Sequence, residues 1–197
     1  MTELIAVATR VLRLRLAPKA TPLADPEDVL TIDFVAYGHE SLLAGSIRLD
    51  AHRLTDLLNA ADELELVDVV CQGPDGSLVD VPRAVVPRPE LVAVKAGDPR
   101  GSPDLRRRTR QTAVMAGAGR YVVHGYVHTR PGADPMIDLG RRPPMVPLTD
   151  ATIVYDTLGG RRRDRASTLV LNRDAADWVR PAKSDELSRL LSDRGAA

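Results

Sequence analysis

Few residues of this 197-residue chain have the types and spacing that metal binding requires. His124 and His128 are four residues apart, and on a helix this spacing places both imidazoles on one face, where they can share a metal ion. The surrounding segment YVVHGYVHT instead predicts a strand, on which residues four apart are separated by roughly 13 Å. We therefore expect two surface histidines on one face of a sheet, and no metal site.

Catalytic chemistry is equally poorly supported. Cys71 is the single cysteine, which excludes a disulfide framework. Its place at a predicted strand end favours the role of a small buried hydrophobic residue over that of a catalytic nucleophile. Asp68 and Asp150 occupy matching places in a repeat described below, which favours a shared structural role in accepting hydrogen bonds. The run Gly117–Gly119 precedes a strand, so it lacks the helix that a phosphate-binding loop needs. We expect a non-enzymatic protein with no catalytic residue and no cofactor.

Arginine gives the best functional lead, because all but three of the 27 basic residues are arginines. Several arginines fall in a predicted linker, in a predicted hairpin loop and in two matching turns, and together they would form a phosphate-binding face. The candidate nucleic-acid-binding residues are Arg88, Arg106, Arg107, Arg108, Arg110, Arg161, Arg162, Arg163 and Arg173. Only six aromatic residues are present, most of them on predicted strands, and the formal net charge is zero. Both facts argue against a dedicated nucleic-acid-binding protein.

Composition indicates an ordinary globular protein, with 44% hydrophobic residues. No signal peptide is evident, and no stretch approaches the roughly 20 apolar residues that span a bilayer. A cytoplasmic location with no membrane partner is the simplest expectation. The excess of arginine over lysine indicates a GC-rich, bacterial genome.

Three short segments recur in the same order, which is typical of a tandem duplication. LAGSIR (43–48) matches VHGYVH (123–128) at an offset of 80, with Gly45 and Gly125 aligned. LVDV (66–69) matches LTDA (148–151) at 82, and VVPR (85–88) matches VLNR (170–173) at 85. The offset grows only by small insertions, so we expect two units of the same fold.

The predicted elements divide the chain into five segments. Alternation, turns and prolines predict an N-terminal segment (1–28) that fits either helix or strand, a first β unit (29–97), an Arg-rich linker (98–112), a second β unit (113–182) and a C-terminal helix or tail (183–197). The first unit has predicted strands at 29–37, 41–49, 63–71, 78–87 and 91–96 and a short helix within 51–61. The second has predicted strands at 113–116, 121–129, 146–156, 167–172 and 177–180, and four prolines across 131–144 argue against a matching helix.

The expected fold is mainly β: two tandem five-stranded small barrels, with a short helix in the first and another at the C-terminus. Five short strands in a unit of this size favour a highly bent barrel, which removes most free edges. Gly45 and Gly125 fall in the middle of the second strand of each unit, where glycine allows a sharp bend.

Segment 32–50, IDFVAYGHESLLAGSIRLD, resembles the opening hairpin of the Sm-like and SH3-like small β-barrel proteins. The apolar-x-Asp-apolar motifs at 66–69 and 148–151 are similar to their third strand. The resemblance implies RNA binding by an Arg-Gly pair in the last turn and an Asn in an earlier loop. Arg88 and Arg173 match that arginine, whereas Pro89 and Asp174 replace the glycine, and Asn59 is near the loop position. Segment 53–59, RLTDLLN, also resembles a stretch of uncharacterised bacterial proteins.

These observations predict a binding or assembly module that acts through exposed barrel edges, with a protein partner or a second copy of itself. The alternative is RNA binding through the arginine-rich loops. An enzyme on a β scaffold is the least supported class.

Overall fold

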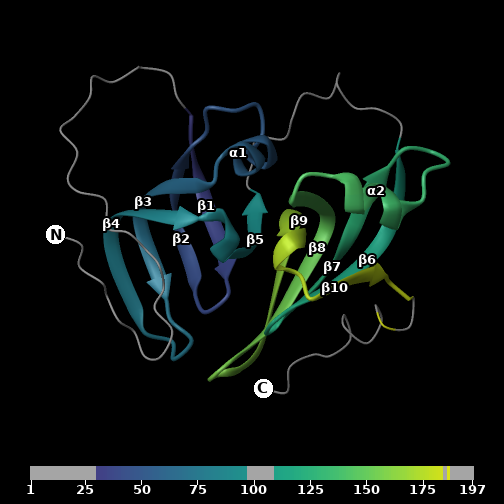
Figure 1. Ribbon diagram of the computed structural model, residues 1–197. Coiled ribbons are helices and arrows are strands. Elements are labelled where there is room, and N and C mark those ends of the chain that lie inside the picture. Colours follow the sequence, from purple (N-terminus) through teal and green to yellow (C-terminus); the bar gives the residue numbers. More distant parts are fainter. Residues whose placement is uncertain (1–29, 97–108, 184–185, 187–197) are drawn as a thin grey trace.

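The structure, a computed structural model, describes residues 30–96, 109–183 and 186 (Figure 1). These residues form one antiparallel sheet of ten strands, accompanied by short helices. The strands are β1 (Thr31–Gly38), β2 (Leu42–Arg48), β3 (Glu63–Gln72), β4 (Leu78–Pro87), β5 (Leu91–Ala96), β6 (Arg110–Ala118), β7 (Tyr121–Thr129), β8 (Met145–Thr157), β9 (Gly160–Asn172) and β10 (Trp178–Pro181). The helices are α1 (Leu54–Ala60), α2 (Pro135–Arg141) and the 3-10 turns η1 (Arg88–Glu90) and η3 (Arg173–Ala175).

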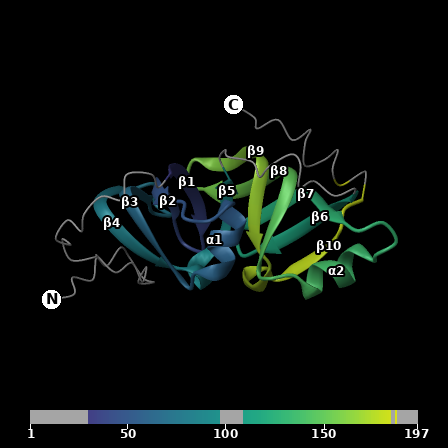
Figure 2. The same cartoon turned by 90° about the horizontal axis from the view of Figure 1, so that it is seen from above.

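The sheet consists of two halves with the same strand order. Its full order is β10-β6-β7-β8-β9-β5-β1-β2-β3-β4, so the first half reads β5-β1-β2-β3-β4 and the second reads β10-β6-β7-β8-β9. The halves lie side by side, with β5 and β9 in the middle (Figures 1 and 2). This arrangement is what a duplicated unit predicts, and the mainly β class is confirmed.

Two strands begin three or more residues earlier than the sequence predicts. β6 starts at Arg110, inside the expected linker, and β9 starts at Gly160, where a hairpin loop holding Arg161–Arg163 was expected. The first part of β9 pairs with β8 in a hairpin whose tip is mostly exposed. The residues of β9 before Leu169 are exposed or partly buried and mostly polar, so the alternation that identifies a strand is missing there.

The prediction of two closed barrels is not confirmed, because the structure has one continuous, open sheet. The fifth strand of the first half, β5, pairs with the fourth strand of the second half, β9. A strand edge carries unpaired N–H and C=O groups, and pairing with another edge satisfies them without closure of either half on itself.

Each half bends at the same place, at a β-bulge that contains an aspartate with a positive φ. Asp68 and Asp150 have φ of 51° and 47°, and the register of the neighbouring strand shifts at both positions. Aspartate is one of the few residues besides glycine that adopt this left-handed conformation readily. The matching role of the two residues is therefore one of backbone conformation at a bulge; both side chains are exposed.

Gly45 and Gly125 lie opposite these bulges, and neither position has room for a side chain. A Cβ on Gly45 would be 2.9 Å from the Val67 carbonyl oxygen, and one on Gly125 would be 2.8 Å from Leu148 Cβ. The expected bend at mid-strand glycines thus has a second cause, the close approach of the next strand.

We predict that Gly45→Ala and Gly125→Ala each destabilise the protein by about 1–3 kcal/mol, because the added methyl group must displace packed neighbours. Urea unfolding followed by circular dichroism measures the loss. Gly140→Ala is the control: Gly140 lies in α2, no atom beyond its chain neighbours and the backbone of its own helix would come within 4 Å of its Cβ, and alanine favours the helix. A stability loss as large in the control would contradict the steric explanation.

The expectation of no helix across 131–144 is wrong. Pro135 occupies the first turn of α2, where the missing N–H costs nothing, and the Asp134 carboxylate accepts hydrogen bonds from the N–H groups of Met136 (2.9 Å) and Ile137 (3.0 Å). Pro143 and Pro144 follow the helix. The prolines therefore start and end a helix of seven residues, as long as α1.

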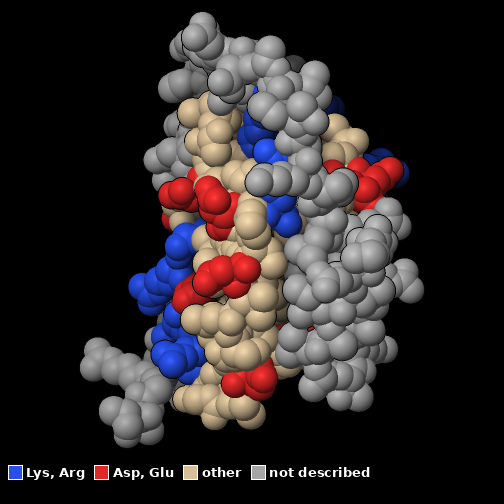
Figure 3. Space-filling model, turned by 90° about the vertical axis from the view of Figure 1, so that its left-hand side faces the viewer, with Lys and Arg blue, Asp and Glu red and all other residues tan. Residues whose placement is uncertain are grey.

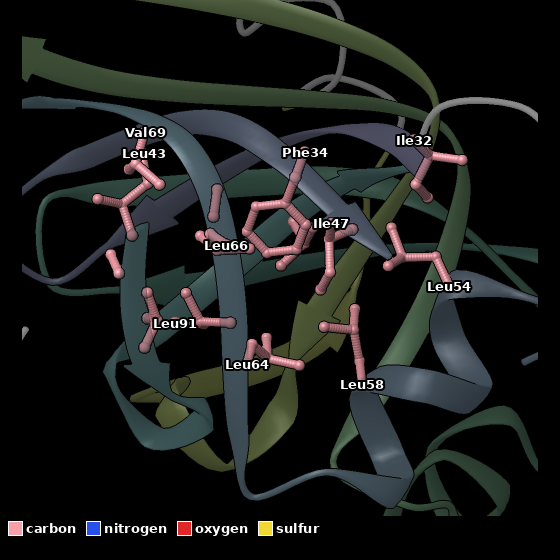
Figure 4. Close-up of a cluster of buried hydrophobic side chains, with 14 of the residues drawn as sticks. Ile32, Phe34, Leu43, Ile47, Leu54, Leu58, Leu64, Leu66, Val69 and Leu91 are labelled. Atoms are coloured by element: carbon pink, nitrogen blue, oxygen red, sulfur yellow. The ribbon is translucent and has the colours of Figure 1, made fainter. Parts of the chain in front are cut away.

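Two hydrophobic clusters fill the halves, and each includes residues of the other half. The first surrounds Phe34, Leu58 and Leu66 (Figure 4) and takes in Met145 and Val170 from the second half. The second cluster takes in Tyr37, Val92 and Ala93 from the first half. The two halves therefore share their cores across the β5–β9 junction.

Some predicted segments lie outside the described residues: the N-terminal segment 1–28, most of the linker and nearly all of the C-terminal helix. No helix within the described ranges is long and apolar enough to cross a membrane.

Candidate functional site

The junction between the halves is where one sheet edge meets another. Ala93, Val94 and Lys95 of β5 lie opposite Leu171, Val170 and Leu169 of β9. All of these residues except Lys95 are buried. The junction is thus a mostly buried antiparallel strand pair between two halves that have the same strand order.

A group of three tyrosines closes one end of this junction. The Tyr37 hydroxyl of β1 donates to Asp164 Oδ2 at 2.9 Å, and the Tyr155 hydroxyl of β8 donates to the same oxygen at 3.0 Å. The Tyr121 hydroxyl donates to the Gly38 carbonyl at 2.8 Å. The three rings are 5.7–5.9 Å apart between centroids, two of the pairs edge to face, a favourable geometry for aromatic rings.

Burial raises the pKa of all three hydroxyls, so they stay protonated. The pKa of Tyr155 is raised to about 12 by burial and by the Asp164 carboxylate, and the pKa of Tyr37 is raised further by the same causes. Burial also raises the pKa of Tyr121, and the neighbouring Arg120 partly offsets this. These groups are donors in a fixed network; they are not proton-transfer groups at neutral pH.

At the other end of the junction, two asparagines form hydrogen bonds between the halves. The Asn59 amide of α1 donates to the Met145 carbonyl at 2.9 Å, and the Met145 N–H donates back to Asn59 Oδ1 at 3.0 Å. The buried Asn172 amide donates to the Leu91 carbonyl at 2.8 Å. Asn59, which the family resemblance placed near an RNA-binding loop, here bonds one half of the protein to the other.

The two ends of the sheet are β4 and β10. Among the described residues β4 pairs only with β3, and β10 pairs only with β6. Each end carries an exposed apolar side chain: Leu78 is 65% exposed and Trp178 is 41% exposed. Trp178 lies over Gly117 and is flanked by Arg180, whose guanidinium carbon is 5.2 Å from the indole ring centroid.

Figure 3 views the molecule from the side on which β4 lies. A band of uncharged residues runs along this side, with acidic groups on it and basic groups at its border. The described part of this face is mixed in charge.

Arg88 and Arg173 occupy matching places and perform the same local task. The Arg88 guanidinium donates to the Asn59 carbonyl at 3.2 Å, near the end of α1, and pairs with Asp62 at 2.9 Å. Arg173 donates to the carbonyls of Leu139, Gly140 and Arg142 at 2.8–3.0 Å, at the end of α2. Both arginines thus satisfy the carbonyl groups that a helix leaves without partners at its C-terminus.

The remaining candidate arginines lie elsewhere. Arg161–Arg163 are near the tip of the β8–β9 hairpin, ten to twelve residues before Arg173, which is roughly 33–40 Å of extended strand. Arg161 pairs with Asp156 at 3.3 Å. Arg110 is exposed at the start of β6, and Arg106–Arg108 lie outside the described residues. The structure brings Arg88 and Arg173 near each other through adjacent η1 and η3, and it separates both from the hairpin tip.

We predict that Arg173→Gln destabilises the protein by about 2–3 kcal/mol, because three helix-end carbonyls lose their charged donor. Thermal unfolding of the full chain measures the effect. Arg162→Gln, at an exposed position of the hairpin, should change stability by less than about 0.5 kcal/mol. Equal stability of both variants and the parent chain would contradict the helix-end role.

The histidines and the cysteine differ in part from expectation. His128 is partly buried and contacts the hydroxyls of Thr109 (3.0 Å) and Thr149 (2.9 Å). His124, expected at the surface, is buried at 4% exposure, and burial lowers its pKa. Cys71 is half-buried against the first core cluster, and burial raises the pKa of its thiol. Among the described residues, no three metal-ligating side chains come together.

Sequence reasoning missed the junction itself. Tyr37 and Tyr155 were expected only as aromatic residues on predicted strands, and Asp164 lies inside the charged run RRRDR. No family model, no curated protein sequence and no solved structure matches this chain.

Proposed function

We propose that the protein is a non-enzymatic assembly module whose copies associate head to tail through the edges of β4 and β10, which are unpaired among the described residues. The main support is the pairing of β5 with β9, where the two copies of the repeated unit already join edge to edge within one chain. In the repeat, β4 is the counterpart of β9 and β10 is the counterpart of β5. The two ends of the sheet are therefore the two sides of this same contact.

The repeat also gives the register of the proposed contact. Val94 and Val170 are opposite each other at the junction, and their counterparts are Val179 and Val85. Val85 and Val179 are only partly buried, whereas the junction valines are completely buried. Pairing would bury apolar side chains at the same positions where the internal junction does.

A second copy of the chain is the expected partner, because β4 and β10 are the counterparts of the two strands that pair at the internal junction. A contact between β4 of one molecule and β10 of the next uses two different surfaces, so it repeats until a ring closes or a filament grows. The resemblance to Sm-like and SH3-like small barrels agrees with this proposal, as does the strand order of each half. The proposal includes two further points: the two halves are tandem units related to the Sm-like and SH3-like small barrels, and the protein acts in the cytoplasm.

Size-exclusion chromatography with light scattering tests the proposal on the full chain. We expect masses that are multiples of 21.4 kDa and increase with concentration. Val85→Lys and Val179→Lys place a charge on each edge and should shift the protein to monomer. Val70→Lys, on the inner strand β3 and already 37% exposed, should leave the mass unchanged. A parent chain that stays monomeric at all concentrations would overturn the proposal.

Nucleic-acid binding is the second candidate, and the exposed Arg161 and Arg162 at the hairpin tip are the observation that favours it. The test is fluorescence anisotropy with labelled single-stranded RNA at low and high salt. Replacement of Arg161–Arg163 by serine should flatten the salt dependence if phosphates are bound. No binding at low salt ends this alternative.

A further inference from the structure

A hollow of about 490 Å³ lies on one face of the second half, across β7, β8 and β9. Its polar lining comes from six side chains: His124, Tyr126, Asp150, Thr152, Arg165 and Ser167. The bulge at Asp150 forms part of its wall. The volume lies within the range of small-molecule sites.

The first half provides an internal comparison, because it has the same strands and the same bulge without this lining. By the strand registers, His124 corresponds to Ala44, Thr152 to Val70 and Arg165 to Asp80. Tyr126 likewise corresponds to Ser46. Only the aspartate of the bulge is the same in both halves. The polar lining is therefore not needed to build the repeated fold.

Several polar groups of the hollow have no ion-pair or side-chain hydrogen-bond partner among the residues that the structure describes. Among the described residues, no ion pair involves Asp150 or Arg165, although they lie on adjacent strands. Within the part of the chain that the structure describes, the Nε2 atom of buried His124 has no hydrogen-bond partner, and such an atom inside a folded protein calls for an explanation. The His124 and Tyr126 rings meet edge to face, with centroids 5.7 Å apart.

From these groups we infer that the hollow binds a small zwitterion, an α-amino acid with a flat side chain. Arg165 receives the carboxylate, Asp150 receives the ammonium group, and the His124 and Tyr126 rings contact the side chain. One cation and one anion make the site neutral, which favours a ligand that carries both charges over a multiply charged anion. A volume of about 490 Å³ exceeds what the backbone atoms of an amino acid fill, so an aromatic side chain suits it better than a small one.

Titration calorimetry and NMR shift mapping of the full chain with L-phenylalanine test the inference. We expect saturable binding at millimolar concentration or below, with shifts at His124 and Tyr126. 3-Phenylpropionate lacks the ammonium group and phenethylamine lacks the carboxylate, so each should bind at least tenfold more weakly. No saturable binding of L-phenylalanine, or equal binding of all three compounds, would overturn the inference.

Matched variants locate the site. Asp150→Asn removes the charge and keeps a residue that tolerates the left-handed conformation, and Arg165→Gln removes the cation. Each should weaken binding at least tenfold, whereas Asp68→Asn, the same change at the bulge of the first half, should not. Unchanged affinity in both second-half variants would overturn the inference. Thermal unfolding checks that each variant is folded, and the analogue series on the parent chain tests the inference even where a variant does not fold.

Discussion

A chain carrying Val85→Cys and Val179→Cys, with Cys71→Ala, will form disulfide-linked multimers under mild oxidation. If β4 of one molecule pairs with β10 of the next as β9 pairs with β5, these two positions lie directly opposite each other. Side chains at opposite positions of an antiparallel pair have Cβ atoms about 4.5–5.5 Å apart, close enough for a disulfide after a small adjustment. Non-reducing gel electrophoresis should show most of the protein as covalent multimers that a reductant returns to monomer.

The control moves one cysteine by a single residue. Val85→Cys combined with Arg180→Cys places the two thiols on opposite faces of the pair, because successive strand residues point to opposite sides. We expect at least a tenfold lower yield of multimers from this chain. Equal cross-linking of both chains would show random collision in place of strand pairing. Multimers by light scattering without cross-links in the first chain would place the contact on another surface.

The strand pattern was accessible to sequence reasoning because it depends on short-range alternation. Gly45, Gly125, Asp68 and Asp150 recur at nearly constant offsets, and each pair serves the same bend. The helix α2 was missed because the prediction used the number of prolines in the segment and ignored where each proline falls relative to the helix. A proline in the first turn starts a helix and only one further inside breaks it, and Asp134 before Pro135 was the available signal.

The junction was not accessible, because it depends on which edges meet in space. β5 and β9 are separated by more than sixty residues, and the sequence of neither strand indicates that it pairs with the other. The contacts of Arg88 and Arg173 with the helix ends were not predicted for a related reason. A repeated arginine fits a phosphate site and a helix end equally well until the carbonyls of α1 and α2 are placed beside it.

Asp164→Ala should destabilise the protein by about 2–4 kcal/mol, because it leaves two buried tyrosine hydroxyls without an acceptor at the junction. Asp156→Ala on the same hairpin removes only an exposed pairing with Arg161 and should cost less than about 1 kcal/mol. Urea unfolding of both variants measures the difference. Equal losses would mean that the tyrosine group does not hold the halves together.

The same network predicts how the parent chain responds to alkali. Tyr37 and Tyr155 have raised pKa values in the folded protein, and the unfolded value is about 10. Above pH 10 the unfolded chain therefore loses protons that the folded chain keeps, so the free energy of unfolding falls as the pH rises from about 10 toward 12. Tyr37→Phe removes one of these groups, and we expect its stability to fall less steeply across that window. A parent chain whose stability stays constant from pH 9 to 12 would contradict the buried, protonated state of these tyrosines.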